Sequence, residues 1–476
     1  MRPLAILTHL QGRGVRLPEE KAITAGKPTR RLSAPQKVYL SLLQHAGDPC
    51  TPVVKKGDRV LRGQLVGEPA GLGAPVHSPI CGRVVAVEPY MHPSGQFVPT
   101  VIIENDGGDS FLPLDRSYLG HADVPEEMDP AGIRRLAQEA GLVGMGGGLF
   151  PTHIKLTPRD DPHPDLLILN GCECEPYLTC DHRLMVEETH VLLWGARAIR
   201  RALGVPQVVI AIEENKPGAI DLIRQMIHGL PGFSVRVLPT RYPQGAERTL
   251  IRTITGRQVP SRGLPADVGV VVHNVGTAAA LGRALLNGEP LMERIVTVAG
   301  DAVRDPGNYW VAIGTPIGEV LREAGLQEEL VRKVILGGPM MGMAASSLEI
   351  PLLKGCGGLL AFTEESATWE EPLPCLRCGR CIEVCPQGLA PVRLTRLVAA
   401  GMLEEAVTQG LLDCVECGAC TFSCPSRRPL IQYLRQGKAE LRRRSQPQEA
   451  PARPAKQPAS KGTPVATEAA TAKATV

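Results

Sequence analysis

The sequence has few aromatic residues, little net charge and no long apolar run. Phe, Trp and Tyr together make up 3% of the 476 residues, so aromatic platforms that stack nucleic-acid bases are not predicted. A formal net charge of +3 gives no global reason to expect a nucleic-acid partner either. We therefore expect a protein that does not bind nucleic acid.

A membrane span and a signal peptide are not predicted. No run reaches the roughly 18 apolar residues that a spanning helix needs, because the best stretch, 268–286, contains His273, Asn274 and Arg283. The short apolar stretch at the N-terminus is not followed by a small-residue cleavage site. We expect a cytoplasmic protein, or one attached peripherally to the cytoplasmic face of a membrane.

The first part of the chain, 1–125, is rich in glycine, proline and valine and predicts short strands joined by turns. Two half-motifs, V-x-x-G-D-x-V-x-x-G-Q and A-P-x-x-S-P-x-x-G-x-V, resemble the barrel-sandwich fold of biotinyl and lipoyl carrier domains. A carrier needs an acceptor lysine at its hairpin tip, but there is no lysine between Gly63 and Gly82. The fold is therefore expected without the carrier function.

The rest of the chain predicts a multidomain α/β protein. Helices alternate with short β-branched runs in 126–290, which indicates a Rossmann-like layered domain with buried parallel strands. A smaller unit at 291–350 reads as a strand pair, a helix and a further strand. The cysteine-rich region at 365–445 is predicted to be helical, and 446–476 has the unperiodic composition of a disordered tail.

Eight cysteines near the C-terminus form two copies of C-x2-C-x2-C-x3-C-P. The first copy is Cys375, Cys378, Cys381 and Cys385, and the second is Cys414, Cys417, Cys420 and Cys424. This spacing places three thiolates on one 4Fe-4S cluster, and in two-cluster ferredoxins the fourth cysteine of each run ligates the other cluster. The predicted ligand sets are Cys375, Cys378, Cys381 and Cys424 for one cluster, and Cys414, Cys417, Cys420 and Cys385 for the second. Two structural zinc sites are the alternative, although zinc usually needs only C-x2-C pairs.

The other cysteines carry a weaker signal. Cys50, Cys81 and Cys356 are expected to be small buried hydrophobic residues. The run Cys172, Cys174 and Cys180 fits no ferredoxin spacing, so it is either structural or redox-active.

A glycine loop, GLVGMGGGLFPTHIKL, follows the helix predicted at 131–140. Glycines allow backbone N–H groups to approach a phosphate closely, but this spacing is not the G-x-G-x-x-G dinucleotide fingerprint. Three further stretches accompany the loop: LNGCECEPYLTCDHRL, RYPQGAERTLI and HNVGTAAAL. The first and third follow predicted strands directly, which is where α/β proteins build their sites.

These motifs occur in the same order in the flavin-bearing, NADH-oxidising subunit of respiratory complex I, which the chain resembles. The chain is more similar to the C subunit of the Rnf (Rsx) electron-transport complex, through FPTHIKL, NGCECEPYLTCDHRLM, YPQGAE and CPSRRPL. That family also has a carrier-like N-terminal domain and a β-grasp domain of the SLBB type, expected here at 291–350. The resemblance covers nearly the whole chain except the tail.

The resemblance implies roles for particular residues. Contacts to the FMN phosphate and ring are implied for Gly144, Gly146, Gly147 and Lys155. Further support of the flavin is implied for Asn170, Glu173, Asn274 and Thr277. Residues near the nicotinamide nucleotide would be Phe150, Glu175 and Glu247, with Tyr242 and Gly245 beside them in the same cofactor site. The chain departs from the family at Gly148, where alanine is usual, and at Ala246, where glycine or an acidic residue is frequent.

The function that the resemblance implies is electron transfer between NADH, FMN and two 4Fe-4S clusters. In the Rnf complex, electron flow between NAD(H) and ferredoxin is coupled to sodium or proton movement by membrane subunits. The chain would be the peripheral NADH-side subunit on the cytoplasmic face of the cell (inner) membrane, with those subunits as partners and ferredoxin as an indirect one. The alternatives are a soluble flavin and iron–sulfur reductase similar to cobalamin reductases, or a non-catalytic electron-transfer protein.

A basic run lies near the C-terminus of the cysteine region, formed by Arg435, Lys438, Arg442, Arg443 and Arg444. It is expected either as a solvated helix end, where cations suit the helix dipole, or as a surface for anionic lipid or an acidic partner.

Overall fold

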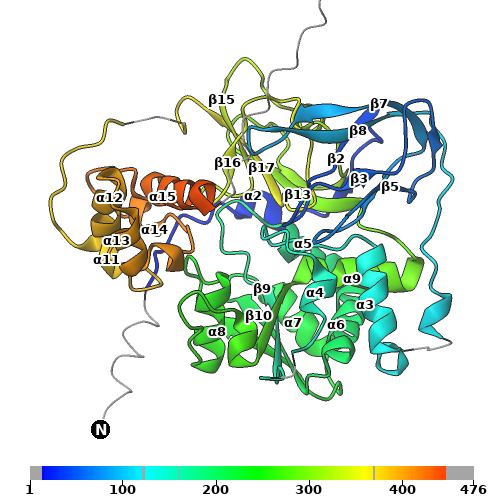
Figure 1. The fold of residues 1–476 in the computed structure, drawn as a ribbon, viewed down its shortest axis with the longest axis horizontal. Coiled ribbons are helices and arrows are strands. Elements are labelled where there is room, and N and C mark those ends of the chain that lie inside the picture. The colour runs from blue at the N-terminus through cyan, green and yellow to red at the C-terminus, as the bar shows by residue number, and fades with distance from the viewer. Residues whose placement is uncertain (1–12, 121–123, 160, 368–369, 446–476) are drawn as a thin grey trace, which may run out of the picture.

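The computed structural model describes residues 13–120, 124–159, 161–367 and 370–445. The predicted disordered tail, 446–476, lies outside these residues. Figure 1 shows a β-rich region beside a layered α/β domain, with a helical module standing to one side. Among the described residues, no helix is both long enough and apolar enough to cross a membrane.

The barrel-sandwich domain consists of two antiparallel sheets. The larger has the order β2-β8-β7-β4 and the smaller the order β3-β5-β6. Their strands are β2 (Lys37–Ser41), β3 (Thr51–Pro52), β4 (Arg59–Val60), β5 (Leu65–Glu68), β6 (Val76–His77), β7 (Gly82–Met91) and β8 (Phe97–Asn105). Alternate residues such as Val38 and Leu40 are fully buried, as expected for strands with one face on a core. Two short 3-10 helices, η1 (Ser117–Leu119) and η2 (Pro125–Glu127), lead to the next domain.

The α/β domain is built on a parallel sheet of order β11-β10-β9-β12. Its strands are β9 (Leu166–Gly171), β10 (Gln207–Glu213), β11 (Phe233–Leu238) and β12 (Val270–Asn274). The chain moves from β9 to one side through β10 and β11, then returns to the other side of β9 with β12. The topological switch point therefore lies between β9 and β12, and ligands of α/β proteins bind at the carboxyl ends of strands at such a point.

Helices cover both faces of this sheet. They are α3 (Pro130–Glu139), α4 (Thr152–Lys155), α5 (Cys180–Glu187), α6 (Thr189–Leu203), α7 (Pro217–Met226), α8 (Glu247–Thr255) and α9 (Val275–Asn287), with η3 (Pro265–Val268) before β12. The core on one face joins Leu167 and Leu169 to α6 and α9, whereas Leu166 and Ile168 pack against α8 on the other. A Cβ atom at Gly195 would lie 1.8 Å from the Ala278 carbonyl oxygen, so glycine is what allows α6 and α9 to pack this closely.

The β-grasp domain is larger than the sequence predicts. Its six-stranded sheet has the order β1-β14-β13-β17-β15-β16, with α10 (Ile317–Glu323) packed against it. The strands are β1 (Arg30–Arg31), β13 (Glu293–Ala299), β14 (Gly307–Ala312), β15 (Val331–Leu336), β16 (Met343–Ala344) and β17 (Gly358–Thr363). The predicted range 291–350 therefore omits β17 and a strand from the N-terminal segment. The predicted range 1–125 likewise includes residues that belong to the other domains.

The N-terminal segment before β2 runs across the α/β and β-grasp domains. Val15 pairs with Tyr242 in an isolated β-bridge, and Lys21, just before α2 (Ala22–Ala25), is buried against the loop that follows β9. This segment thus connects the two domains before the barrel-sandwich begins.

The helical module contains the eight cysteines in their two runs. It consists of α11 (Arg380–Glu383), α12 (Pro391–Ala399), α13 (Leu403–Thr408), η4 (Leu411–Asp413), α14 (Ala419–Phe422) and α15 (Leu430–Ser445). Its own core includes Leu394, Leu411 and Leu434. The module contacts the α/β domain near α8, where Arg252 donates to the Pro386 carbonyl oxygen over 2.9 Å.

Candidate electron-transfer site

Two cavities in the helical module are each lined by four of the eight cysteines. The first, here called the inner cavity, is lined by Cys385, Cys414, Cys417 and Cys420. The second, the outer cavity, is lined by Cys375, Cys378, Cys381 and Cys424. These are the same two sets that the spacing predicts, with the fourth cysteine of each run in the other cavity. Four thiols around one hollow are the donor set that a 4Fe-4S cluster requires, so the residues present fit both clusters.

The two cavities differ in their access to solvent. Cys385, Cys417 and Cys420 are buried, and the inner cavity lies toward the α/β and β-grasp domains. Cys378 of the outer cavity is exposed, and its three companions are half-buried. The names inner and outer follow from this difference.

The glycine loop is attached to the start of α9. The backbone N–H of Met145 donates to Thr277 Oγ1 over 3.0 Å, and a Cβ atom at Gly146 would lie 3.3 Å from that of Asn274. Beyond this anchor the loop is open: Gly146, Gly147 and Gly148 are exposed. Their backbone N–H groups have no hydrogen-bond partner among the described residues. Three free N–H groups on a glycine loop suit an anionic group such as a phosphate.

Two asparagines end the strands on either side of the switch point. Asn170 and Asn274 lie opposite each other in the register of β9 and β12. Asn274 caps α9 by accepting from the Gly276 N–H over 2.8 Å, and its Nδ2 donates to Asp181 over 2.6 Å. Asn170 Nδ2 donates to the carbonyl oxygen of Gly245 over 2.9 Å. The predicted strand-end motifs and the RYPQGAERTLI stretch therefore meet at one edge of the sheet.

Lys155 and Glu247 are also brought together there. The ammonium group of Lys155 donates to Glu247 Oε1 over 3.1 Å and to the carbonyl oxygen of Val272 over 2.6 Å. Phe150, at the end of the glycine loop, is 36% exposed. The loop, Lys155 and the first turn of α8 therefore lie around the carboxyl end of β12, and the FMN contacts predicted for these residues stay a prediction.

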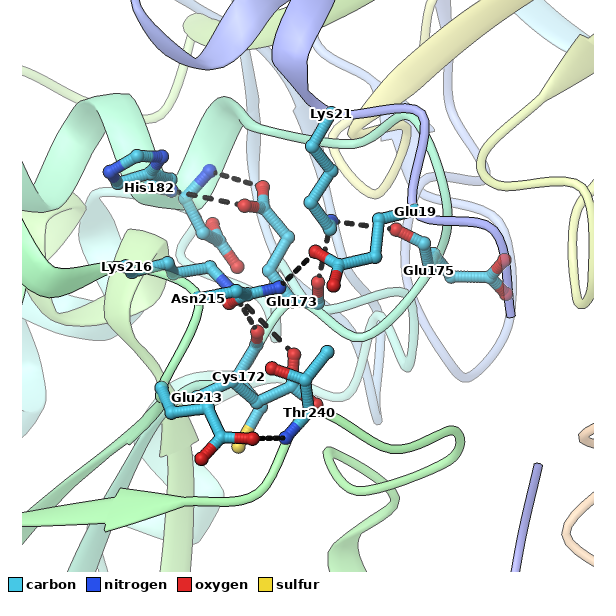
Figure 2. Close-up of polar contacts among 12 residues, drawn as sticks. Glu19, Lys21, Cys172, Glu173, Glu175, His182, Glu213, Asn215, Lys216 and Thr240 are labelled. Atoms are coloured by element: carbon cyan, nitrogen blue, oxygen red, sulfur yellow. Dashed lines mark hydrogen bonds and ion pairs between the residues drawn. The ribbon is translucent and has the colours of Figure 1, made fainter. Parts of the chain in front are cut away.

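Two buried lysines hold the loop that follows β9 (Figure 2). Lys21 donates to the carbonyl oxygens of Glu173 and Glu175, both over 2.8 Å, and of Leu178. From the opposite side, Lys216 donates to the carbonyl oxygen of Cys172 over 2.6 Å. Burial lowers the pKa of Lys21, and it raises the pKa of Glu213, whose carboxylate lies 3.6 Å from the Lys216 ammonium group, to about 7.

Glu173 caps the N-terminus of α5. Its carboxylate accepts from the backbone N–H groups of Asp181 over 2.7 Å and His182 over 3.2 Å, as an acidic group at a helix N-terminus does. Its backbone has φ of 48°, a left-handed conformation that the Lys21 contacts help to hold. Burial and the neighbouring Glu173 charge raise the pKa of Asp181.

The polar groups of Glu175 and Tyr242 are bound by other domains, that of Glu175 by a loop of the β-grasp domain and that of Tyr242 by the helical module. The Glu175 carboxylate accepts from the backbone N–H groups of Met340 over 3.0 Å and Met341 over 2.9 Å, in the loop between β15 and β16. Burial raises the pKa of Glu175. Tyr242 is buried, and its hydroxyl donates to the carbonyl oxygen of Cys417 over 2.7 Å. The nucleotide contacts predicted for these two residues stay a prediction, because the structure gives their polar groups protein partners.

The remaining cysteines are poor candidates for redox chemistry. Burial raises the pKa of Cys172 and Cys180 well above its usual range, and that of Cys174 to about 12. A protonated thiol is a weak nucleophile, so their burial favours the structural alternative over the redox-active one. Cys50, Cys81 and Cys356 are buried, as predicted.

The basic run of α15 has intramolecular partners. Lys438 donates to the Cys414 carbonyl oxygen over 2.6 Å and to Glu416 over 3.0 Å. Arg443 and Arg444 pair with Glu440. The expectation of a simple solvated helix end is therefore wrong for Lys438, which supports the wall of the inner cavity.

Sequence reasoning missed several residues that shape the site. Lys21 lies about 150 positions before the loop that it holds, and Lys216 follows a different strand, so no local pattern connects them to it. Asp181 could have been found from the sequence, because it follows Cys180 directly in the T-C-D-H-R-L part of a motif that was already assigned to the site.

Four family models match the chain. They are an RnfC barrel sandwich hybrid domain over residues 10–108, a Nuo51 FMN-binding domain over 137–283, an SLBB domain over 295–344 and a 4Fe-4S dicluster domain over 374–428. The four descriptions agree with the predicted fold class of each region.

Curated relatives match over most of their length. The C subunit of the Na(+)-translocating ferredoxin:NAD(+) oxidoreductase complex of Acetobacterium woodii is 42% identical over 90% of this chain and 96% of its own. The corresponding protein of the proton-translocating complex of Clostridium ljungdahlii is 42% identical over 90% of this chain and 93% of its own. The C subunit of the ion-translocating oxidoreductase complex of Rhodobacter capsulatus is 44% identical over 90% of this chain and 83% of its own.

Proposed function

This chain belongs to the family formed by the C subunits of Rnf-type ion-translocating oxidoreductase complexes, and we propose that it is the NAD(H)-side electron-transfer subunit of such a complex. FMN and two 4Fe-4S clusters are its cofactors, and NADH is its substrate. The relatives are named as subunits of oxidoreductase complexes, which indicates that this chain is also a component of such a complex.

One observation carries this proposal: the flavin-type site and the inner cysteine cavity are joined through buried side chains of a single chain. Tyr242 belongs to the stretch whose Gly245 is bound by Asn170 at the sheet edge. The same Tyr242 hydrogen-bonds the backbone of Cys417. We infer that electrons that enter at the sheet edge reach the inner cavity through this packed contact.

The division of chemistry follows from the cofactors. FMN exchanges electron pairs with NADH as hydride and single electrons with 4Fe-4S clusters, so it bridges a two-electron and a one-electron carrier. When FMN is bound, the free N–H groups of Gly146, Gly147 and Gly148 and the positive charge of Lys155 would hold its phosphate. Asn170 and Asn274 fix the ends of the two strands at this edge of the sheet. No side chain is required as a general acid or base.

We further propose an order for the two clusters. The buried inner cavity contacts the α/β domain through Tyr242 and Arg252, whereas the outer cavity includes the exposed Cys378. Electrons from NADH then reach the inner cluster first and the outer cluster second, where another protein can take them up. The reverse flow uses the same order backwards.

Ion movement across the membrane would require other subunits of the complex. We propose that the chain binds the membrane subunits of a complex that couples NAD(H)–ferredoxin electron transfer to ion movement, and that ferredoxin acts on it indirectly. It would then act as a peripheral subunit on the cytoplasmic face of the cell membrane. The relatives include both a Na(+)-translocating and a proton-translocating complex, so the ion that is transported differs within the family.

Two glycine substitutions test the flavin site. Gly147 has φ of +98°, which an L-residue rarely adopts, whereas Gly148 has no positive φ and no atom within 4 Å of the place that a Cβ atom would take. We expect Gly147→Ala to lose most of its FMN and Gly148→Ala to retain it. Bound flavin is measured by fluorescence after acid release from the reconstituted chain, and NADH-dependent ferricyanide reduction is measured on the same samples.

The two measurements can either support or contradict the flavin site. Flavin loss and activity loss that occur together in Gly147→Ala alone support the site. A wild-type chain reconstituted with FMN, iron and sulfide that cannot reduce ferricyanide with NADH contradicts the proposed function.

A further inference from the structure

The glycine loop is held at its start by two neighbouring domains. Gly141, where the loop begins, has φ of +63°, and a Cβ atom there would lie 2.2 Å from the carbonyl oxygen of Pro75. Pro75 ends the connection between β5 and β6 of the barrel-sandwich domain. The buried side chain of Lys354, in the β-grasp loop 345–357 that precedes β17, donates to the carbonyl oxygens of both Pro75 and Gly141, over 2.6 Å and 2.8 Å. One side chain therefore joins three domains at the start of the loop.

The end of the loop is held by the same two domains at Leu149. Leu149 has φ of 51°, a left-handed conformation that a branched residue keeps only when its surroundings hold it. Its carbonyl oxygen accepts from the backbone N–H of Ala46, in the barrel-sandwich domain, over 3.0 Å. Its side chain packs on Gly355 of the β-grasp loop, where a Cβ atom would lie 2.7 Å from Leu149 Cδ2. Both domains therefore fix this residue.

Between its two ends the loop packs on the same neighbours. Leu142 and Met145 belong to one apolar core with Ala74 of the barrel-sandwich domain. The carbonyl oxygen of Met145 accepts from Arg294 of β13 over 3.4 Å, and Arg294 also donates to the carbonyl oxygen of Lys354 over 2.6 Å. The three exposed glycines that follow Met145 are therefore flanked on both sides by residues that the two domains hold.

The carrier-like hairpin is part of these contacts. A carrier domain would need its acceptor lysine in the stretch between Gly63 and Gly82, and this chain has none there. The same stretch instead accepts a hydrogen bond from Lys354 of another domain at Pro75. Ala74 and Pro75 are buried, whereas a carrier must present its hairpin to other sites. The hairpin is therefore built into the interior beside the glycine loop.

We propose that the barrel-sandwich domain is a scaffold for the flavin site: its residues Ala46 and Pro75, together with Lys354 and Gly355 of the β-grasp loop, hold the glycine loop in its FMN-binding conformation. The inference rests on the proposed function, because it takes the glycine loop as the place that binds the FMN phosphate. Lys354 and Gly355 are positioning residues, since they act through the loop. The loop is then ordered before FMN binds, which lowers the entropic cost of binding.

Hydrogen exchange of the wild type tests whether the loop is ordered in advance. The full chain is reconstituted with iron and sulfide but without FMN. The backbone N–H groups of Gly144, Leu149 and Thr152 are hydrogen-bonded to carbonyl oxygens of the loop, so we expect them to exchange at least about tenfold more slowly than in an unstructured peptide. Exchange at the unstructured rate, with protection only after FMN is added, overturns the proposal, because FMN itself would then order the loop.

Two substitutions then test the contacts themselves. Lys354→Met removes the donor to both carbonyl oxygens at the start of the loop, and Gly355→Ala places a Cβ atom against Leu149. Gly437→Ala on α15 is the matched control, because a Cβ atom there would lie 2.6 Å from a methyl group of Val398, a similar clash within the helical module. The Kd for FMN is measured by fluorescence quenching on the same flavin-free, cluster-loaded chains, and urea unfolding reports their stability.

We expect the Kd for FMN to rise at least about tenfold in Lys354→Met and Gly355→Ala and to stay within about twofold in Gly437→Ala. At saturating FMN, the KM for NADH and the NADH–ferricyanide rate per bound flavin should stay within about twofold in all three. A Kd within twofold of the wild type in both loop variants overturns the proposal, and so does an equal rise in Gly437→Ala or an equal fall in the rate per bound flavin. A wild-type chain that does not bind FMN contradicts the proposed function instead, so the two failures are distinguishable.

Discussion

The hydroxyl group of Tyr242 donates a hydrogen bond to the carbonyl oxygen of Cys417 over 2.7 Å. This contact joins the α/β domain, which carries the flavin-type loop, to the wall of the inner cysteine cavity. Tyr242 is 2% exposed and packs in one apolar cluster with Cys417 and Ala419. The two redox regions are therefore held together by a buried contact and not by a flexible linker alone.

Removing this hydroxyl should weaken the attachment of the helical module. Tyr242→Phe leaves a buried carbonyl unpaired, which costs about 1–3 kcal/mol. We expect faster hydrogen exchange in residues 414–420 and slower reduction of the clusters by NADH, with the KM for NADH unchanged. Tyr118→Phe is the control, since its hydroxyl makes a bond of equal length to Glu139 far from the cysteines. A raised KM with unchanged cluster reduction would show that Tyr242 serves the nucleotide directly.

Paired cysteine substitutions test the crossed grouping of the ligands. Cys385 shares the inner cavity with Cys414, whereas Cys381 of the same run lines the outer one. We expect Cys385→Ala combined with Cys414→Ala to lose about half of the iron, and Cys385→Ala combined with Cys381→Ala to lose nearly all of it. Iron content and the EPR spectra of the reduced proteins give the answer. The opposite pattern would mean that each run holds its own cluster.

Lys354 predicts a pH dependence of stability. Its ammonium group is fully buried and donates to the carbonyl oxygens of Pro75 over 2.6 Å and Gly141 over 2.8 Å. Burial lowers its pKa from 10.5 to about 7. Between these two values the unfolded chain binds the proton and the folded chain does not, so the contribution of Lys354 to stability rises with pH through this window.

The measurement compares urea unfolding of the wild type and Lys354→Met from pH 7 to pH 10. The free energy of unfolding of the wild type should rise relative to the variant by up to about 1.4 kcal/mol per pH unit. A constant difference across this range would mean that Lys354 keeps its ordinary pKa in the folded protein.

Local sequence patterns predicted the parts of the site whose members lie close together in the chain. The two C-x2-C-x2-C-x3-C-P runs define each cavity because three of its four ligands are within seven positions of one another. The ends of β9 and β12 were also predictable, because Asn170 and Asn274 each stand at the end of a short buried strand. At these positions the residues that form the site are close together in the sequence, so their spacing was enough to predict them.

Contacts between distant segments could not be predicted in this way. Glu175 accepts hydrogen bonds from Met340 and Met341, and nothing in the motif around Glu175 indicates that a loop of the β-grasp domain lies there. The strands β1 and β17 were missed for the same reason, because β1 is only two residues long and joins a sheet formed mostly after residue 290. Tertiary packing decides such contacts.

The order of the two clusters tests the account most directly. The chain is reduced with NADH and frozen within milliseconds, and EPR is used to follow each cluster in the wild type, in Cys414→Ala and in Cys378→Ala. If electrons pass through the inner cavity first, the inner cluster of Cys378→Ala is reduced as fast as in the wild type, while the outer cluster of Cys414→Ala stays oxidised on the same time scale. Reduction of the outer cluster at the wild-type rate in Cys414→Ala would contradict this order and the route through Tyr242.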